Sequence, residues 1–179
     1  MKKLMIASAI AMAMTAGSAM AALGDAGSQG QVQFVGTVAA KTCDVGVVGN
    51  GAVNDLIQLG TVAKGQPGVD KHFSIKFKDL TCATGLTKAN FIWSSPVFDT
   101  NKLNNQNGSA TGSYVELKAK NGATNAANHY DLIGSGKNAV QFTFSDATAA
   151  NGFEYTAKLT GGQTAGTFES AAAYTIVYE

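Results

Sequence analysis

The sequence has 179 residues, of which 45% are hydrophobic and 14% are charged, with 13 lysines, no arginine, 12 acidic residues and a net charge of +1. This apolar content is too high for a disordered chain and suits one folded domain. Arginine, the best bidentate reader of phosphates and bases, is absent and the lysines form no long run, so we expect no nucleic-acid partner. Two histidines and two cysteines are too few for a multi-metal enzyme site.

The first 21 residues have the pattern of a secretory signal peptide. Lys2 and Lys3 precede an uncharged apolar stretch at 4–14, and small residues frame a cleavage site between Ala21 and Ala22. A membrane anchor is the alternative, but an anchor needs about 20 apolar residues and this stretch is shorter. We therefore expect an exported protein whose mature chain begins at Ala22.

The mature chain is predicted to be almost entirely β-structure. Apolar residues recur at every second position in runs that are separated by Asn-Gly, Pro-Gly and Gly-Gly turn signals. Strands are expected, in chain order, at 31–38, 56–60, 72–78, 91–93, 114–120, 140–144, 153–159 and 174–178. One helical turn is expected at 147–150, and a long polar surface loop at 99–112. About eight short strands in a chain of this length predict an antiparallel β-sandwich.

The run at 72–78 shows the alternation most clearly. Its core face is expected to hold Phe73, Ile75 and Phe77, and its solvent face Ser74, Lys76 and Lys78. His72 also falls on the polar face, so we interpret it as a solvated side chain and not as a catalytic one.

The two cysteines, Cys43 and Cys82, are predicted to form a disulfide. Oxidising compartments outside the cytoplasm favour pairing, and two cysteines allow a single bridge within the chain. Closing a loop of about 40 residues stabilises a fold by roughly 4 kcal/mol in the chain-entropy model. A metal site or a nucleophilic cysteine is the alternative, but neither cysteine has a nearby histidine or a C-x-x-C partner.

Catalytic chemistry is mostly absent from the sequence. No nucleophile elbow, zinc-protease, P-loop or EF-hand motif occurs, and we expect no catalytic, cofactor-binding or metal-binding residue and no cofactor. Asp131 and Asp146 are interpreted as turn formers, and His129 is far from His72 in the sequence. Trp93, inside an apolar run, is expected in the core.

The two ends of the mature chain leave two architectures open. Small and polar residues at 22–30 lead without a turn signal into the alternating Val32 and Phe34, while a strand with alternating apolar residues ends the chain. One architecture is a closed sandwich with a disordered leader. The other is an open sandwich whose missing strand comes from another chain. Composition alone does not choose between them.

The order of several short motifs resembles the subunits of bacterial chaperone–usher fimbriae, of the type 1 pilin kind. The similar segments are the stretch from Gly30 to Cys43, the run at 56–60, the strand that ends at Cys82, and a C-terminal strand with a penultimate tyrosine and a glycine fourteenth from the end, here Gly166. Each motif is weak alone, but the set in this order covers essentially the whole mature chain.

The resemblance implies an incomplete immunoglobulin-like β-sandwich that lacks its last strand and is completed by donor-strand exchange. It implies a pilin domain at 36–179 and an N-terminal extension at 22–35, with the donor-strand residues Ser28, Gly30, Val32 and Phe34. It places the groove and the chaperone-binding surface at Gly166, Tyr174, Ile176 and Tyr178. The implied partners are a periplasmic chaperone, an outer-membrane usher, other copies of the subunit and other fimbrial subunits, on a route through the periplasm to an extracellular fimbria.

The kind of subunit is a separate question. The chain has no room for a second, lectin-like domain, so we expect a major structural subunit, with an adaptor or a terminator as the alternative. A host receptor could bind the loop at 99–112. Two other classes stay open: a secreted monomeric carbohydrate-binding β-sandwich that uses Trp93 and Tyr114, and an exported enzyme.

Overall fold

The structure is a computed structural model that describes residues 43–49, 52–53, 55–121 and 132–179. They belong to one compact unit of the chain, Val38–Glu179. The predicted signal peptide and its cleavage site, the extension at 22–35, the strand at 31–38, His129 and Asp131 all lie outside the described residues, as do the positions of Ser28, Gly30, Val32 and Phe34.

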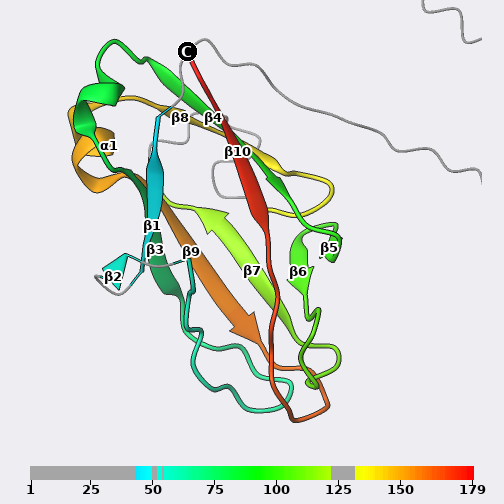
Figure 1. The fold of residues 1–179 in the computed structure, drawn as a ribbon. Coiled ribbons are helices and arrows are strands. Elements are labelled where there is room, and N and C mark those ends of the chain that lie inside the picture. The colour runs from blue at the N-terminus through cyan, green and yellow to red at the C-terminus, as the bar shows by residue number, and fades with distance from the viewer. Residues whose placement is uncertain (1–42, 50–51, 54, 122–131) are drawn as a thin grey trace, which may run out of the picture. The chain divides into compact units, whose positions relative to one another are not determined.

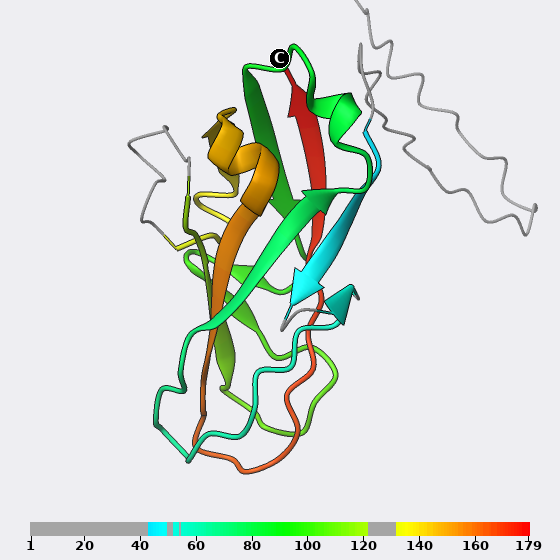
Figure 2. The ribbon, with the colours of Figure 1, turned by 90° about the vertical axis from the view of Figure 1, so that its left-hand side faces the viewer.

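Two antiparallel sheets face each other across a common core (Figures 1 and 2). The larger sheet has the order β2-β1-β3-β9-β7-β6-β5, and the smaller has the order β10-β4-β8. The strands are β1 (Val45–Gly49), β2 (Ala52–Val53), β3 (Lys71–Phe77), β4 (Lys88–Ser94), β5 (Phe98–Asp99), β6 (Lys102–Asn104), β7 (Tyr114–Ala119), β8 (Ala139–Thr143), β9 (Phe153–Thr160) and β10 (Ala173–Tyr178). The predicted all-β antiparallel sandwich is therefore confirmed.

Two short helices complete the fold: a 3-10 helix, η1 (Leu80–Ala83), and α1 (Asp146–Asn151). The helical turn expected at 147–150 is confirmed as α1. The Ser145 hydroxyl caps its first turn by accepting a hydrogen bond from Thr148 N, and Gly152 ends it at a positive φ of 79°. Within the described ranges, neither helix is long and apolar enough to cross a membrane.

The core between the sheets is largely aromatic. The ring of Phe91 lies 4.7 Å from Phe153 and 5.4 Å from Phe142, in edge-to-face contacts that such rings prefer. Trp93 Nε1 donates a hydrogen bond of 3.4 Å to the Tyr155 hydroxyl, and both side chains are buried. Burial of each large side chain contributes about 1.5–3 kcal/mol. The core position predicted for Trp93 is confirmed, and it removes that side chain as a platform for sugars.

The alternation predicted for β3 holds on its core face and fails at one position of its outer face. Phe73, Ile75 and Phe77 are buried, and His72 is exposed, as expected. Ser74 was expected to face water but is buried, because β3 lies between two strands that place Val48 and Glu154 beside it. An outward residue of a central strand is covered by its neighbours in a way that period-two alternation does not reveal.

Two other sequence-based expectations are wrong. The run at 56–60 is not a strand, since residues 55–66 join no ladder of either sheet. The stretch 99–112 is not a plain surface loop. It contains the end of β5, the β5–β6 turn and β6, and Leu103 and Ala110 within it are buried.

Candidate functional site

The outer edge of β10 carries no ladder partner among the described residues. On its inner edge β10 pairs with β4 along its whole length, from Ala173 opposite Ser94 to Tyr178 opposite Ala89. A strand edge of this kind presents unpaired N–H and C=O groups that can bond another strand. The edge of β10 therefore offers a place for an added strand.

The side chains of Tyr174, Ile176 and Tyr178 point from β10 toward the core and remain partly exposed. The ring of Tyr174 lies 5.3 Å from Trp93, and that of Tyr178 lies 5.8 Å from Phe77. These three side chains thus form one half-buried apolar row along the free edge, which the alternation of 174–178 predicted.

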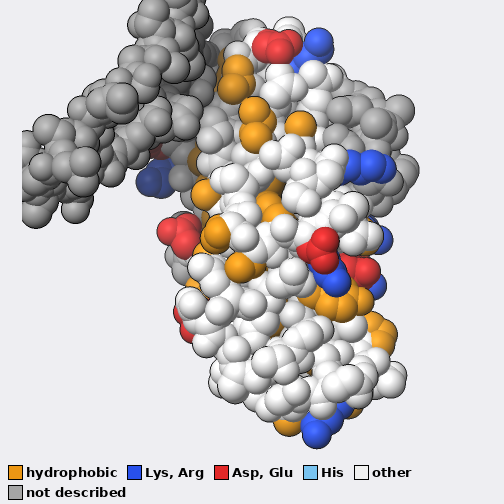
Figure 3. Space-filling view, turned by 90° about the vertical axis from the view of Figure 1, so that its right-hand side faces the viewer, with side chains coloured by type: hydrophobic (Ala, Val, Ile, Leu, Met, Phe, Trp, Pro, Cys, Tyr) orange, Lys and Arg blue, Asp and Glu red, His pale blue; other side chains and the backbone are white. Residues whose placement is uncertain are grey.

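An open groove of about 530 Å³ lies beside the segment that leads into β10. One wall is residues 56–64, the other is residues 161–170, and Leu159, Ala110 and Ser113 line it as well. Ile57, Leu59 and Val62 are partly buried there against the core, while the neighbouring Leu56 is 69% exposed. Figure 3 shows hydrophobic side chains gathered in a row on one face of the molecule, with few charges among them.

The groove wall at 56–64 explains the wrong strand prediction. Its apolar residues have the composition of a strand, but a strand needs a bonding neighbour, and no strand of either sheet pairs with this segment within the described residues.

The tyrosines of the free edge remain neutral at physiological pH. Burial raises the pKa of Tyr178 to about 12, with a smaller contribution from Tyr174. Burial also raises the pKa of Tyr174, and the negative charge of Asp55 raises it further. That effect of Asp55 indicates that the start of the 56–64 wall lies near β10.

Gly166 lies where the groove wall meets the loop that precedes β7. A Cβ atom at this position would collide with the Ser109 side chain and would lie 2.7 Å from Ala110 N. Asn105 also holds the loop before β7 against the groove wall. Its Nδ2 donates to Gly108 O at 2.7 Å, and its Oδ1 accepts from Glu169 N at 2.9 Å. The absence of a side chain at Gly166 therefore lets the two segments pack closely.

Replacing Gly166 with alanine is expected to destabilise this end of the groove by about 1–3 kcal/mol, the usual cost of overpacking. Urea unfolding of the purified protein would measure the change. Gly136→Ala is the matched control, because a Cβ there would meet Thr100 O at an ordinary 3.4 Å. Equal stability of the two variants would contradict the close packing of Gly166.

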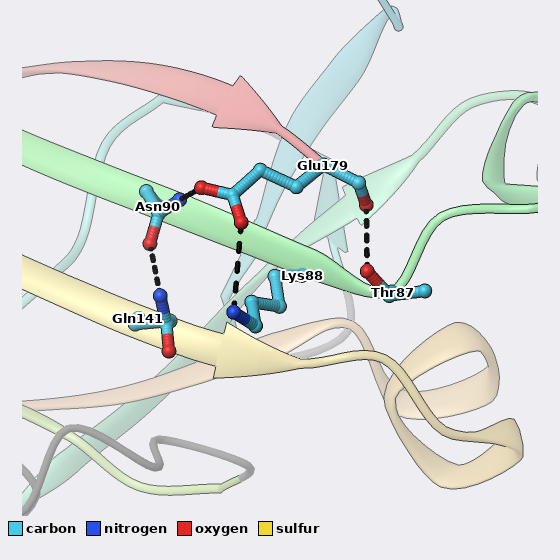
Figure 4. A network of polar contacts seen from close by, with 5 residues as sticks. All are labelled: Thr87, Lys88, Asn90, Gln141 and Glu179. Atoms are coloured by element: carbon cyan, nitrogen blue, oxygen red, sulfur yellow. Dashed lines mark hydrogen bonds and ion pairs between the residues drawn. The ribbon is translucent and has the colours of Figure 1, made fainter.

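The far end of β10 is held on its inner side by a polar network (Figure 4). Asn90 Nδ2 donates to Glu179 Oε1 at 2.7 Å, and Lys88 Nζ lies 3.6 Å from Glu179 Oε2. Gln141 Nε2 donates to Asn90 Oδ1 at 2.8 Å, and Thr87 Oγ1 donates to Glu179 O at 3.2 Å. This network joins three strands of the smaller sheet and fixes β10 against β4. Sequence reasoning missed it, since no local pattern signals contacts between residues that lie 51 to 92 positions apart.

The predicted disulfide between Cys43 and Cys82 is confirmed, with a Cα–Cα distance of 5.8 Å. It joins the residues before β1 to η1, and Cys43 packs against the core. No group of three or more potential metal ligands occurs in the part of the chain that the structure describes.

The chain is similar to known proteins in sequence and in structure. The chain is 41% identical, over 182 aligned positions and the full length of both sequences, to the F107 fimbrial protein of Escherichia coli. Among solved structures it is similar to the rod subunit PapA of the P pilus, at 16% identity and a TM-score of 0.44, over 70% of this chain and 93% of that one. No family model matches the sequence.

Proposed function

This chain belongs to the family of bacterial fimbrial proteins, and we propose that its subunits join by donating a strand from one to the next. It is a structural subunit of a fimbria on the cell surface, where it contacts other fimbrial subunits, and a monomeric carbohydrate-binding module is not favoured. In the proposed assembly, residues 22–35 of one subunit lie along the free edge of β10 in its neighbour.

The observation that carries this proposal is the unpaired edge of β10 beside the groove. An edge strand with half-buried apolar side chains is an aggregation hazard unless something covers it. An added strand would bond the edge and fill the groove at the same time, which is the mode of recognition called strand addition.

The sequence of the extension supports this role. Residues 22–35 carry no lysine, and Val32 and Phe34 alternate with glutamines. Inserting these two side chains would contribute roughly 1.5–3 kcal/mol each. Main-chain hydrogen bonds along β10 would add to that and would align the strand.

The same edge requires protection before assembly. We infer that a periplasmic chaperone covers β10 after export and that an outer-membrane usher replaces it with the next subunit. Gly166 in the groove wall and the row of Tyr174, Ile176 and Tyr178 on β10 would serve the chaperone first and the donor strand afterwards. The support for this order is that the bare edge would otherwise pair with any strand available in the periplasm.

Gly30→Leu is expected to block fibre assembly or to slow it strongly, while leaving the subunit–chaperone complex intact. Gly30 shares the inward face of the extension with Val32, so a leucine there would overpack the space beside β10. Electron microscopy and SDS-resistant ladders of unboiled samples would score assembly.

Gln31→Leu is the matched control for this substitution. It places the same side chain on the opposite face of the extension, where it should be tolerated. Equal assembly of both variants would contradict the proposed function, because neither face of the extension would then enter a groove.

A further inference from the structure

The sequence contains four Asn-Gly pairs, at 50–51, 107–108, 121–122 and 151–152. An asparagine followed by glycine is especially prone to deamidation, because glycine has no side chain to shield its backbone nitrogen. Asparagine is for this reason counted among the thermolabile residues of proteins. The pair at 50–51 lies outside the described residues, whereas Asn107, Asn121 and Asn151 lie within them.

Deamidation of Asn107 requires a free and mobile nitrogen at Gly108. This nitrogen attacks the side-chain carbon Cγ of Asn107, so that an N–Cγ bond forms, the Cγ–Nδ2 bond breaks, and ammonia leaves with the proton of the attacking nitrogen. Water then opens the cyclic succinimide at one of its two carbonyl carbons and leaves aspartate or isoaspartate. Water is the only other reactant, and Asn107 is exposed to it.

In the folded chain the attacking nitrogen is already bonded. Gly108 N donates to Asn105 Oδ1 at 3.1 Å, and Asn105 Nδ2 donates back to Gly108 O at 2.7 Å, so one side chain holds both polar groups of this glycine. A Cβ atom at Gly108 would collide with Thr167 O. The nitrogen therefore lies in a place too tight for it to turn toward the side chain of Asn107.

The backbone on both sides of Gly108 is held as well. Five consecutive N–H groups, those of residues 106–110, each donate a hydrogen bond of 2.9 to 3.2 Å. Glu169 O accepts the first two, Asn105 Oδ1 accepts the third, and the side chain and the carbonyl of Thr167 accept the last two. Residues 105–110 must therefore separate from residues 167–169 before the nitrogen becomes free.

We propose that Asn107 is a modification site, a deamidation site that is closed while Asn105 holds Gly108 and that reacts only when this loop opens. The opening is a local unfolding event, and its free energy sets the fraction of time during which the site can react. Reaction would add a negative charge at residue 107, and an isoaspartate would lengthen the backbone, so the five hydrogen bonds could not all form again. Closure therefore preserves the groove wall at 161–170, to which this loop is bonded.

The other two asparagines provide internal references. Asn121 Nδ2 donates to Gly152 O at 3.0 Å and its Oδ1 accepts from Glu154 N at 2.7 Å, so its side chain is bonded to a distant segment. Asn151 is the last residue of α1, and Gly152 N donates to Thr148 O at 2.9 Å. Neither site is bonded to Asn105, so a change of Asn105 should alter the rate at Asn107 alone.

Mass spectrometry of the purified full-length chain tests the closure of the site. The folded protein and the same protein in guanidinium chloride are kept at mildly alkaline pH, and the deamidated fraction at Asn107 is followed in peptides. We expect the folded protein to react at least about 10-fold more slowly, the factor that corresponds to an opening free energy of about 1.4 kcal/mol. Equal rates in the folded and the unfolded protein would overturn the proposal.

Substitution of Asn105 tests its part in the closure. Asn105→Ala is expected to raise the rate at Asn107 in the folded protein by about 2–10-fold, the range of one net hydrogen bond, and to leave Asn121 and Asn151 unchanged. Asn105→Asp keeps an oxygen that accepts from Gly108 N, so its rate should lie between those of the wild type and the alanine variant. An unchanged rate at Asn107 in the alanine variant, or an equal rise at all three asparagines, would contradict the assignment.

Thr111→Val is the matched control. It removes the hydrogen bond of 2.8 Å between Thr111 Oγ1 and Thr164 Oγ1, which joins the same loop to the same groove wall without touching Gly108. We expect its rate at Asn107 to stay close to that of the wild type. If this variant accelerates Asn107 as much as Asn105→Ala does, general loosening of the loop controls the site and the proposal fails. None of these rates depends on strand donation, so this inference and the proposed function stand or fail independently.

Discussion

Deletion of residues 22–35 is expected to abolish fibre formation and to leave chaperone binding intact. The deleted subunit keeps the free edge of β10 and the groove, so it can still receive a strand. It can no longer supply one, and the loss should be complete, because every junction of the fibre would require this segment. Co-purification with the chaperone and electron microscopy of surface fibres measure the two properties separately.

A second form of this experiment mixes the subunit that lacks residues 22–35 with the full-length chain. The deleted subunit should occupy at most one end of each fibre, since it receives a strand without donating one. Replacing Gln31 and Gln33 with serine is the control, because it changes the outward face of the same segment. Fibres of normal length built from the deleted subunit alone would show that the donor strand lies elsewhere.

Loss of the Cys43–Cys82 disulfide is expected to have the second largest effect. The bridge closes a loop across a sequence separation of 39, which is worth roughly 4 kcal/mol in the chain-entropy model. Total stabilities of folded domains are about 5–15 kcal/mol. The paired substitution Cys43→Ser with Cys82→Ser should therefore severely lower the yield of assembled subunit. It should also lower the urea concentration at which half of the subunit in the subunit–chaperone complex is unfolded.

The paired substitution leaves no free thiol, so misoxidation cannot explain a low yield. Mass measurement of the native wild type before and after thiol alkylation is the companion test, and no mass change is expected. Two alkylated cysteines in native protein, or an unchanged urea midpoint after the paired substitution, would contradict the role assigned to this bridge.

Most of the fold could be predicted from local patterns. Alternation located β3, β7, β9 and β10, because one side of each strand faces an aromatic core and the other is on the whole more exposed. The apolar row of Tyr174, Ile176 and Tyr178 could be predicted from the sequence for the same reason. The disulfide between Cys43 and Cys82 could be predicted because an exported chain meets an oxidising compartment, and two cysteines allow a single bridge within the chain.

The parts that sequence reasoning missed depend on contacts between distant segments. The apolar run at 56–60 looks like a strand, yet nothing within the described residues bonds it as one. β5 and β6 have two and three residues, too few for any periodicity to appear. Ser74 is buried by neighbouring strands, and the Glu179 network joins residues that only the folded sheet brings together.

The position of Trp93 gives this protein a built-in optical signal. It is the only tryptophan of the chain, it is 5% exposed, and its ring lies 5.2 Å from Tyr155 and 5.3 Å from Tyr174 of β10. Any rearrangement of β10 therefore changes the surroundings of a single fluorophore. The intrinsic fluorescence of an unlabelled subunit reports on the strand that borders the groove, so strand capture and release can be timed in solution without an added dye.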